Sequence, residues 1–157
     1  MTVNTAGGST FHIGPVIDAL TDTVAEFQTL SYVEVGEIED LGQIGDEDSE
    51  VQFTAVGDRR VRKLKGPSDA GTLQVVCGDD DSDNGQVAML AAFADKTSEY
   101  AFKIVLANQL TISGDPGEMY FRGRVMSKRR NVGNVSNVVR RNFNVAVNSE
   151  VLEVAAT

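Results

Sequence analysis

The sequence predicts a mainly β protein, a two-sheet β-sandwich or barrel with one flanking α-helix. At least six short segments alternate apolar and polar residues with the period of two that a half-buried strand requires. Glycine is plentiful, at 15 of 157 residues, which suits a fold with many turns. Only one segment, in the middle of the chain, combines helical spacing with a strong capping signal.

The strands follow from local composition and alternation. The run 32–39 alternates apolar and acidic residues, and 72–77 is rich in β-branched residues. The turn Gly114-Asp115-Pro116-Gly117 separates two further strand regions. In chain order, the expected strands are 32–39, 51–56, 72–77, 100–106, 110–113 as the hairpin partner of the preceding strand, 119–127 and 142–147, with a short apolar tail over 151–154.

The predicted helix runs from Asp83 or Asn84 to about Asp95. Val87, Leu90, Ala91 and Ala94 recur at helical spacing. Asp83, followed by a glutamine three residues later, resembles a capping box, and nearby acidic residues suit a helix N-terminus.

The chain is long enough for one domain with a sizeable core. Residues 1–15 are polar and are interpreted as an N-terminal arm, and 16–157 as a single domain. A short amphipathic piece is expected over 16–30, where threonines leave helix and strand both open. Residues 42–71, polar and glycine-rich, are longer than an ordinary connection and are interpreted as a functional or mobile loop.

The charge is unevenly distributed along the chain. The net charge of −9 argues against ordinary nucleic-acid binding, which needs phosphate neutralisation. The first 58 residues contain twelve Asp and Glu but no Lys or Arg, and most basic residues follow in 59–65 and 122–141. Two readings are open: separately solvated faces, or a protomer whose acidic side meets the basic side of a neighbour. The second arrangement yields rings or filaments.

We expect the inter-subunit contacts to use charged residues in and beside the long loop. The basic run from Arg59 to Lys65 could instead protect the edge of a strand against unwanted pairing. Lys128-Arg129-Arg130 and Arg140-Arg141 have the same two interpretations. The candidate interface residues are Asp46, Glu47, Asp48, Glu50, Arg59, Arg60, Arg62, Lys63 and Lys65.

No catalytic, cofactor-binding or metal-binding residue is predicted. The run Asp80-x-Ser82-x-Asn84-Gly85 imitates the start of a calcium loop, but its last ligand position falls on Ala91, which cannot bind the ion. His12 is the only histidine and lies in the expected arm, without a nucleophile motif elsewhere. Cys77 is the only cysteine and lies in an apolar strand, which favours an inert buried thiol.

The sequence contains neither a membrane-spanning apolar stretch of ~18 residues nor a secretory signal at 1–15. A single cysteine excludes an intrachain disulfide and fits folding in a reducing cytoplasm.

The middle of the chain, about 32–127, resembles the major tail tube proteins of long-tailed, non-contractile bacteriophages. The resemblance depends on the order of several motifs around one strand, an acidic loop and a helix. These motifs are Gly36-Glu37-Ile38, Arg62-Lys63-x-Lys65-Gly66-x-x-Asp69-x-Gly71-x-Leu73, Leu90 with Phe93 on the helix, Phe102-x-Ile104-x-Leu106 and Phe121-x-Gly123-x-Val125-x-Ser127.

This resemblance implies a structural protein, not an enzyme. Six copies would form a ring, and rings would stack into a tube whose inner barrel draws strands from 32–41, 51–65 and 119–147. The long loop and terminal arms would bridge successive rings. Implied partners are further copies, a tape measure protein, a tail terminator and tail tip proteins. DNA would pass through the lumen without sequence-specific binding, and the net negative charge suits that passage. The implied location is the virion tail, assembled in the host cytoplasm.

Three alternatives remain open at this stage. A tube protein of a contractile tail or of a type VI secretion system would share the fold. A monomeric β-sandwich binding module would share the strands without the assembly. A calcium-dependent hydrolase would use the loop 79–84.

Overall fold

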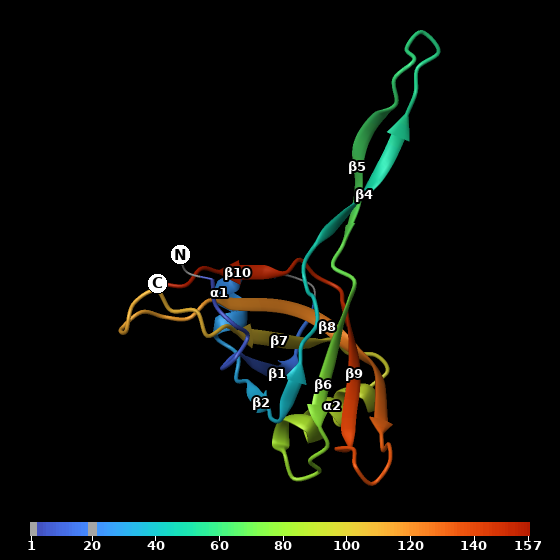
Figure 1. Ribbon diagram of the computed structural model, residues 1–157. Coiled ribbons are helices and arrows are strands. Elements are labelled where there is room, and N and C mark those ends of the chain that lie inside the picture. The colour runs from blue at the N-terminus through green and yellow to red at the C-terminus, as the bar shows by residue number, and fades with distance from the viewer. Residues whose placement is uncertain (1–2, 19–21) are drawn as a thin grey trace.

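The computed structural model describes residues 3–18 and 22–157, and within them the protein is mainly β, as predicted (Figure 1). Ten strands and two helices occur in these residues. The strands are β1 Thr10–Val16, β2 Val33–Val35, β3 Ile38–Asp40, β4 Glu47–Phe53, β5 Arg62–Asp69, β6 Thr72–Gly78, β7 Tyr100–Val105, β8 Glu118–Asn131, β9 Arg140–Val147 and β10 Leu152–Val154; the helices are α1 Val24–Gln28 and α2 Asn84–Ala94.

The main sheet has two layers that share strand β8. The first half of β8 pairs with β7 on one side and β10 on the other, and its second half pairs with β9. The first layer is therefore β2-β1-β7-β8-β10, and the second is β8-β9-β6-β3. The two layers expected of a sandwich are present, and they are joined in one hydrogen-bonded sheet.

Gly123 marks the point at which β8 passes from one layer to the other. It pairs with Tyr100 of β7 and with Val147 of β9, and a β-bulge follows between Val125 and Ser127. A Cβ atom on Gly123 would lie 2.4 Å from the carbonyl oxygen of Ala146. The close approach of the two backbones thus requires glycine at this position.

The core lies between the layers and is built by the period-two alternation. Inward residues of the first layer include three stacked aromatic rings: Phe102 lies 5.8 Å from Phe11 and 5.2 Å from Phe121, between ring centroids. The second layer contributes the buried residues Leu73, Val75, Cys77, Phe143 and Val145. Met89 and Ala92 of α2 belong to the same cluster, so the helix closes one end of the core.

Helix α2 begins where the sequence predicts. The Asp83 carboxylate accepts a hydrogen bond from the Gln86 backbone N–H at 2.9 Å, the expected N-cap contact. The same carboxylate accepts from the Gly36 N–H at 3.0 Å. The Gln86 side chain differs from a capping box, because its amide donates to the Gly78 carbonyl at 2.7 Å. Asp83 and Gln86 together therefore attach the helix to the segment between β2 and β3 and to β6.

A second, smaller core covers the outer face of the first layer. Phe27 of α1 is fully buried and stacks on Tyr120 of β8 at 5.9 Å between ring centroids. Tyr32 donates from its hydroxyl to the Phe27 carbonyl at 2.8 Å. Arg122 ties this region to the sheet through an ion pair with Asp22 at 3.1 Å. Helix α1 falls within the amphipathic piece expected over 16–30, of which 19–21 lie outside the described residues.

The expected arm over 1–15 is wrong from residue 10 onward. Residues 10–16 form β1, an inner strand of the first layer paired with both β2 and β7. Phe11 and Ile13 are buried there. Phe11 and Ile13 are the only two apolar residues of the alternating pattern before Gly14 and Pro15 interrupt it. This pattern of apolar and polar residues is too short to indicate a strand in a polar segment. Residues 1 and 2 lie outside the described residues.

Two expected strands also differ. The run 32–39 forms two strands, β2 and β3, that belong to different layers and meet at Glu37, whose φ of 58° lies in the left-handed region. Residues 110–113 form no strand; β7 pairs instead with β8. Leu110 donates to the carbonyl oxygen of Thr157 at 3.0 Å, and the Thr157 N–H donates to the Asp115 carbonyl at 2.9 Å. The end of the chain thus takes the backbone partners that a local hairpin would have used.

Substitution of Phe102 by alanine should destabilise the protein strongly. The ring is fully buried between two other rings, so its loss removes buried area and leaves a cavity. We expect a loss of about 3–5 kcal/mol in the free energy of unfolding, measured by urea denaturation. Val87→Ala on the exposed side of α2 is the control and should change the value by under about 0.5 kcal/mol. Equal effects of the two substitutions would contradict this account of the core.

Candidate assembly surfaces

The region expected as a loop over 42–71 contains a β-hairpin that projects from the body (Figure 1). Strands β4 and β5 pair with each other in a separate sheet, from Glu47 opposite Asp69 to Phe53 opposite Arg62. Every residue of β4 is exposed, and so is nearly all of β5. The alternation in 51–56 indicated a strand here, but the glycines and charges around it obscured the length of the hairpin.

One face of the hairpin holds charges that pair across the strands. Lys65 lies 3.4 Å from Asp48, and Lys63 lies 3.7 Å from Glu50. Such exposed pairs contribute little to stability, typically ~0.2–1 kcal/mol each. They do neutralise one another, so this face presents little net charge to a partner. Four of the candidate interface residues therefore have partners on the opposite strand of the hairpin.

The other candidate residues lie at the two ends of the hairpin. Near its base, Asp46 accepts a hydrogen bond from the Val151 N–H at 3.2 Å, and Glu47 begins β4. Near its tip, Arg62 pairs with Asp58 at 3.0 Å. Among the described residues, Arg59 and Arg60 form no ion pair, which leaves the tip basic.

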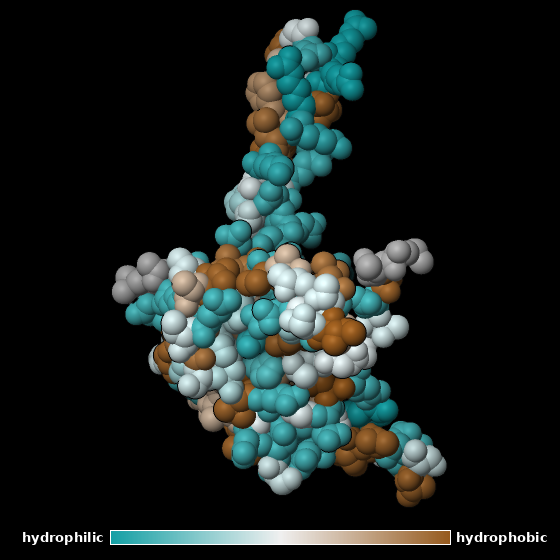
Figure 2. Space-filling view, turned by 90° about the vertical axis from the view of Figure 1, so that its left-hand side faces the viewer, coloured by the Kyte–Doolittle hydropathy of each residue, from teal (hydrophilic) through white to brown (hydrophobic). Residues whose placement is uncertain are grey.

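The opposite face of the hairpin is mostly apolar, with Arg62 opposite Phe53 at its outer end. Val51 and Leu64 are direct cross-strand partners, and Phe53 follows two residues along β4 on the same side. Their exposed fractions are 46%, 59% and 55%. Figure 2 shows brown patches along the hairpin among teal atoms. Charge patterning alone did not single out these three residues, although the alternation of Val51-Gln52-Phe53 contained the signal.

The outer face of the second layer is polar, with uncharged side chains at its centre and arginines toward β8 and the end of β9. Outward positions alternate with the buried ones, and no described element packs across this face in the manner of α1 on the first layer. The outward residues of β6 and β9 include Thr72, Gln74, Asn142 and Asn144.

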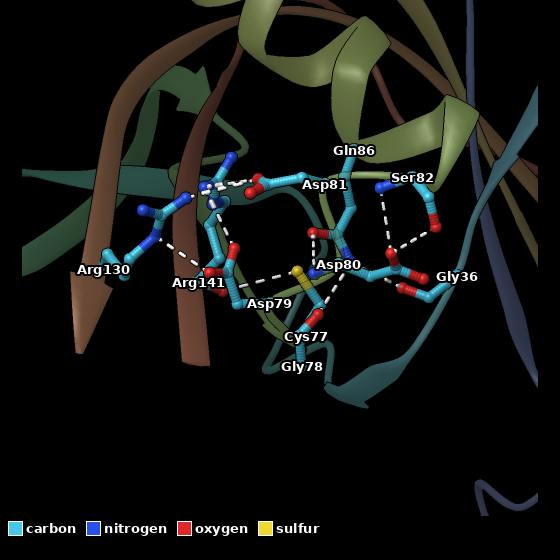
Figure 3. Close-up of polar contacts among 10 residues, drawn as sticks. All are labelled: Gly36, Cys77, Gly78, Asp79, Asp80, Asp81, Ser82, Gln86, Arg130 and Arg141. Carbon is cyan, nitrogen blue, oxygen red and sulfur yellow. Dashed lines mark hydrogen bonds and ion pairs between the residues drawn. The ribbon is translucent and has the colours of Figure 1, made fainter. Parts of the chain in front are cut away.

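The acidic loop after β6 is a structural clamp (Figure 3). Asp79 lies 2.9 Å from both Arg130 and Arg141, which come from the paired ends of β8 and β9. Asp80 accepts hydrogen bonds from the backbone and hydroxyl of Ser82, which lowers its pKa. Because arginines and helix capping occupy these carboxylates, the calcium interpretation of 79–84 has no support. Among the described residues, no group of three or more His, Cys, Asp or Glu could hold a metal ion.

The remaining reactive side chains belong to the packed sheet. Cys77 is fully buried, and burial, assisted by Asp79 and Asp83, raises the pKa of its thiol to about 11. His12 lies in β1 within hydrogen-bond distance of the Thr10 hydroxyl, at 2.9 Å, and burial followed by nearby Lys103 lowers its pKa. No described helix is long and apolar enough to cross a membrane.

Comparison with known proteins gives a clear result for the fold. No family model and no curated protein matches the sequence. Among solved structures, a chain of the anti-feeding prophage baseplate is similar with a TM-score of 0.72 and 9% identity, over 99% of this chain and 98% of that one. The chain therefore has the fold of components of phage tails and related injection systems.

Two further similar structures come from a tube and from the end of a tube. The SPP1 tail tube protein matches with a TM-score of 0.63 and 16% identity, over 95% of this chain and 78% of that one. The sheath/tube terminator of an extracellular contractile injection system matches with a TM-score of 0.66 and 8% identity, over 98% and 97% of the two chains. At these identities the likeness concerns the fold.

The thiol of Cys77 should be almost unreactive in the folded protein. A pKa of about 11 and full burial both keep the thiolate population low. With Ellman's reagent at pH 8 we expect modification at least about 100-fold slower than that of an exposed thiol, and rapid modification in guanidinium. Val132→Cys, at an exposed position, supplies the fast internal reference. A native Cys77 that reacted as quickly as that reference would refute its burial.

Proposed function

We propose that this protein is a structural subunit that assembles into stacked hexameric rings and forms the tail tube of a non-contractile phage or phage-derived particle. The observation that supports it most is the amphipathic β4–β5 hairpin on a tail-tube fold. A solitary two-stranded hairpin is at best marginally stable in water. An exposed arm with an apolar face is therefore best explained by a partner that covers it.

The apolar face of the hairpin can supply appreciable binding energy. Complete burial of a Val, Leu or Phe side chain gains about 1.5–3 kcal/mol, and these three are roughly half exposed. Covering all three would gain on the order of 2–4 kcal/mol per hairpin before ordering costs. In a ring or stack every subunit makes this contact, so a modest contribution per subunit is repeated throughout the assembly.

The other partners follow from a role in a tail. A tube of this kind would meet a tape measure protein, a tail terminator and tail tip proteins, and DNA would slide through its lumen without sequence-specific contacts. Assembly would take place in the host cytoplasm and the product would reside in the virion tail. Imaging of the native particle tests the non-contractile assignment, because a sheath around the tube would show a contractile system instead.

Two candidates compete with this proposal. A contractile-tail or type VI secretion tube protein shares the fold, and two of the similar structures come from contractile or prophage-derived particles. A monomeric β-sandwich binding module would use the hairpin on a different partner. Light scattering at increasing protein concentration separates the second candidate, since a binding module stays monomeric while a tube subunit grows.

Removal of the hairpin should abolish polymerisation without unfolding the body. Replacing residues 48–68 by a short Gly-Ser linker leaves both cores intact, because neither contains a residue of β4 or β5. We expect cooperative thermal unfolding as in the parent protein, and no rings or tubes in negative-stain images. Tubes that persisted after the deletion would contradict the role assigned to the hairpin.

Polar substitution of the apolar face should weaken assembly more than substitution of the charged face. Val51→Thr with Leu64→Thr keeps β-propensity but removes the methyl and isobutyl surface available to a partner. We expect at least about a tenfold rise in the concentration at which tubes appear, by sedimentation. Glu50→Gln with Lys63→Gln, on the charged face, is the matched control and should change that concentration little. Equal effects on both faces would argue against apolar docking.

A further inference from the structure

The turn between β8 and β9 exposes an apolar surface. Residues 131–139 contain four valines and no charged residue. Val135 is fully exposed, and Val132 and Val138 are 60% and 63% exposed. Single exposed apolar residues are ordinary on a protein surface, but three within seven positions form a patch of the kind that marks a contact site.

Asparagines fix the backbone of this turn. The side chain of Asn134 accepts a hydrogen bond from the Ser136 N–H at 3.0 Å. The carbonyl oxygen of Asn134 accepts a hydrogen bond from the Asn137 N–H, also at 3.0 Å. Gly133 has a φ of 68°, in the left-handed region that glycine adopts readily. Because these polar groups bond to one another, the turn presents its valines on a defined backbone, which lowers the entropy cost of covering them.

The turn and the β4–β5 hairpin lie at opposite ends of the second layer (Figure 1). Thr72, the residue of β6 nearest the hairpin, pairs with Ala146 of β9. At the other end of the same two strands, Gly78 pairs with Arg140, which directly follows the turn. A second copy placed in the same orientation beyond the hairpin therefore presents the end that bears its turn. Such a head-to-tail contact can repeat from copy to copy, as the stacking of rings requires.

The turn is the uncharged one of the three connections at that end of the layer. The β2–β3 connection contains Glu37, and the β6–α2 connection contains four aspartates within 79–83. Docking of the apolar hairpin face on these connections would remove charges from water, whereas docking on the valines removes apolar surface from water on both sides. The centres of protein interfaces are depleted in charged residues for the same reason. Chemistry and position thus select the same surface.

We propose that the apolar face of the hairpin, formed by Val51, Phe53 and Leu64, docks on the turn 132–139 of a second copy in the next ring. This inference rests on the proposed function and assigns the surface that receives the hairpin. Every residue of β4 is exposed, so the hairpin's own body does not cover this face. The contact covers two apolar surfaces that are both left in water in the single chain.

Removal of the valine surface should impair the formation of tubes. The variant has Val132→Ser, Val135→Ser and Val138→Ser. We expect tubes to appear at a concentration at least about tenfold higher than for the wild type, by sedimentation and negative-stain imaging. Leu110→Ser with Ile112→Ser is the matched control, because it removes exposed apolar side chains from the connection between β7 and β8, and it should assemble as the wild type does. Circular dichroism and thermal unfolding verify that both variants are folded.

Cross-linking tests the contact itself. Val51→Cys and Val135→Cys are prepared as separate proteins, mixed before assembly and treated with a short bis-maleimide. The native Cys77 is fully buried and should not react. We expect a cross-linked dimer with one copy of each variant, identified by mass spectrometry of the joined peptides. A mixture of Val51→Cys and Ile112→Cys is the control and should yield no such dimer.

The outcomes separate this inference from the proposed function. A wild-type protein that stays monomeric at all concentrations overturns both. Wild-type tubes together with unimpaired assembly of the folded serine variant, or without a cross-link between positions 51 and 135, overturn the docking alone. Equal impairment by the Leu110 and Ile112 substitutions does so too, because a general loss of apolar surface then explains the effect.

Discussion

Strand β8 is hydrogen-bonded to both layers, and the rest of the molecule is arranged around it. The first half of β8 pairs with β7 and β10, and its second half pairs with β9. The close approach of the β8 and β9 backbones at Gly123 allows β8 to belong to both layers. Phe121 and Val125, on the two sides of that glycine, point into the same core. Because the layers are parts of one sheet, hydrogen bonds along β8 hold them in register, and α2 closes one end of the core.

The distribution of charge has a structural explanation at most positions. Asp79 is held by Arg130 and Arg141, and Asp48 and Glu50 are matched across the hairpin by Lys65 and Lys63. Most basic residues of the described chain are thus paired with acidic residues, several of them far away in the sequence, and an excess of acidic residues remains, as the net charge of −9 requires.

Much of the fold could be predicted from the sequence, and the misses have definite causes. Helix α2 and strands β6, β7, β8 and β9 were found because alternation or capping extends over enough residues. Strand β1 was missed since only Phe11 and Ile13 mark it. The hairpin was interpreted as a loop because both of its faces are exposed to water. Without a buried face, its sequence lacks a long alternation of apolar and polar residues.

The connection between hairpin and body has a mechanical consequence. Strand β5 ends at Asp69 and β6 begins at Thr72, so the arm is attached almost directly to a core strand, and Figure 1 shows the two running on in one direction. A force that pulls the arm along its length would shear β6 against β9, and the paired residues from Thr72 to Gly78 would share that force. Hydrogen bonds that are loaded together in this way resist a larger force than hydrogen bonds that are broken one after another. The arm is thus anchored where a tensile load is borne best.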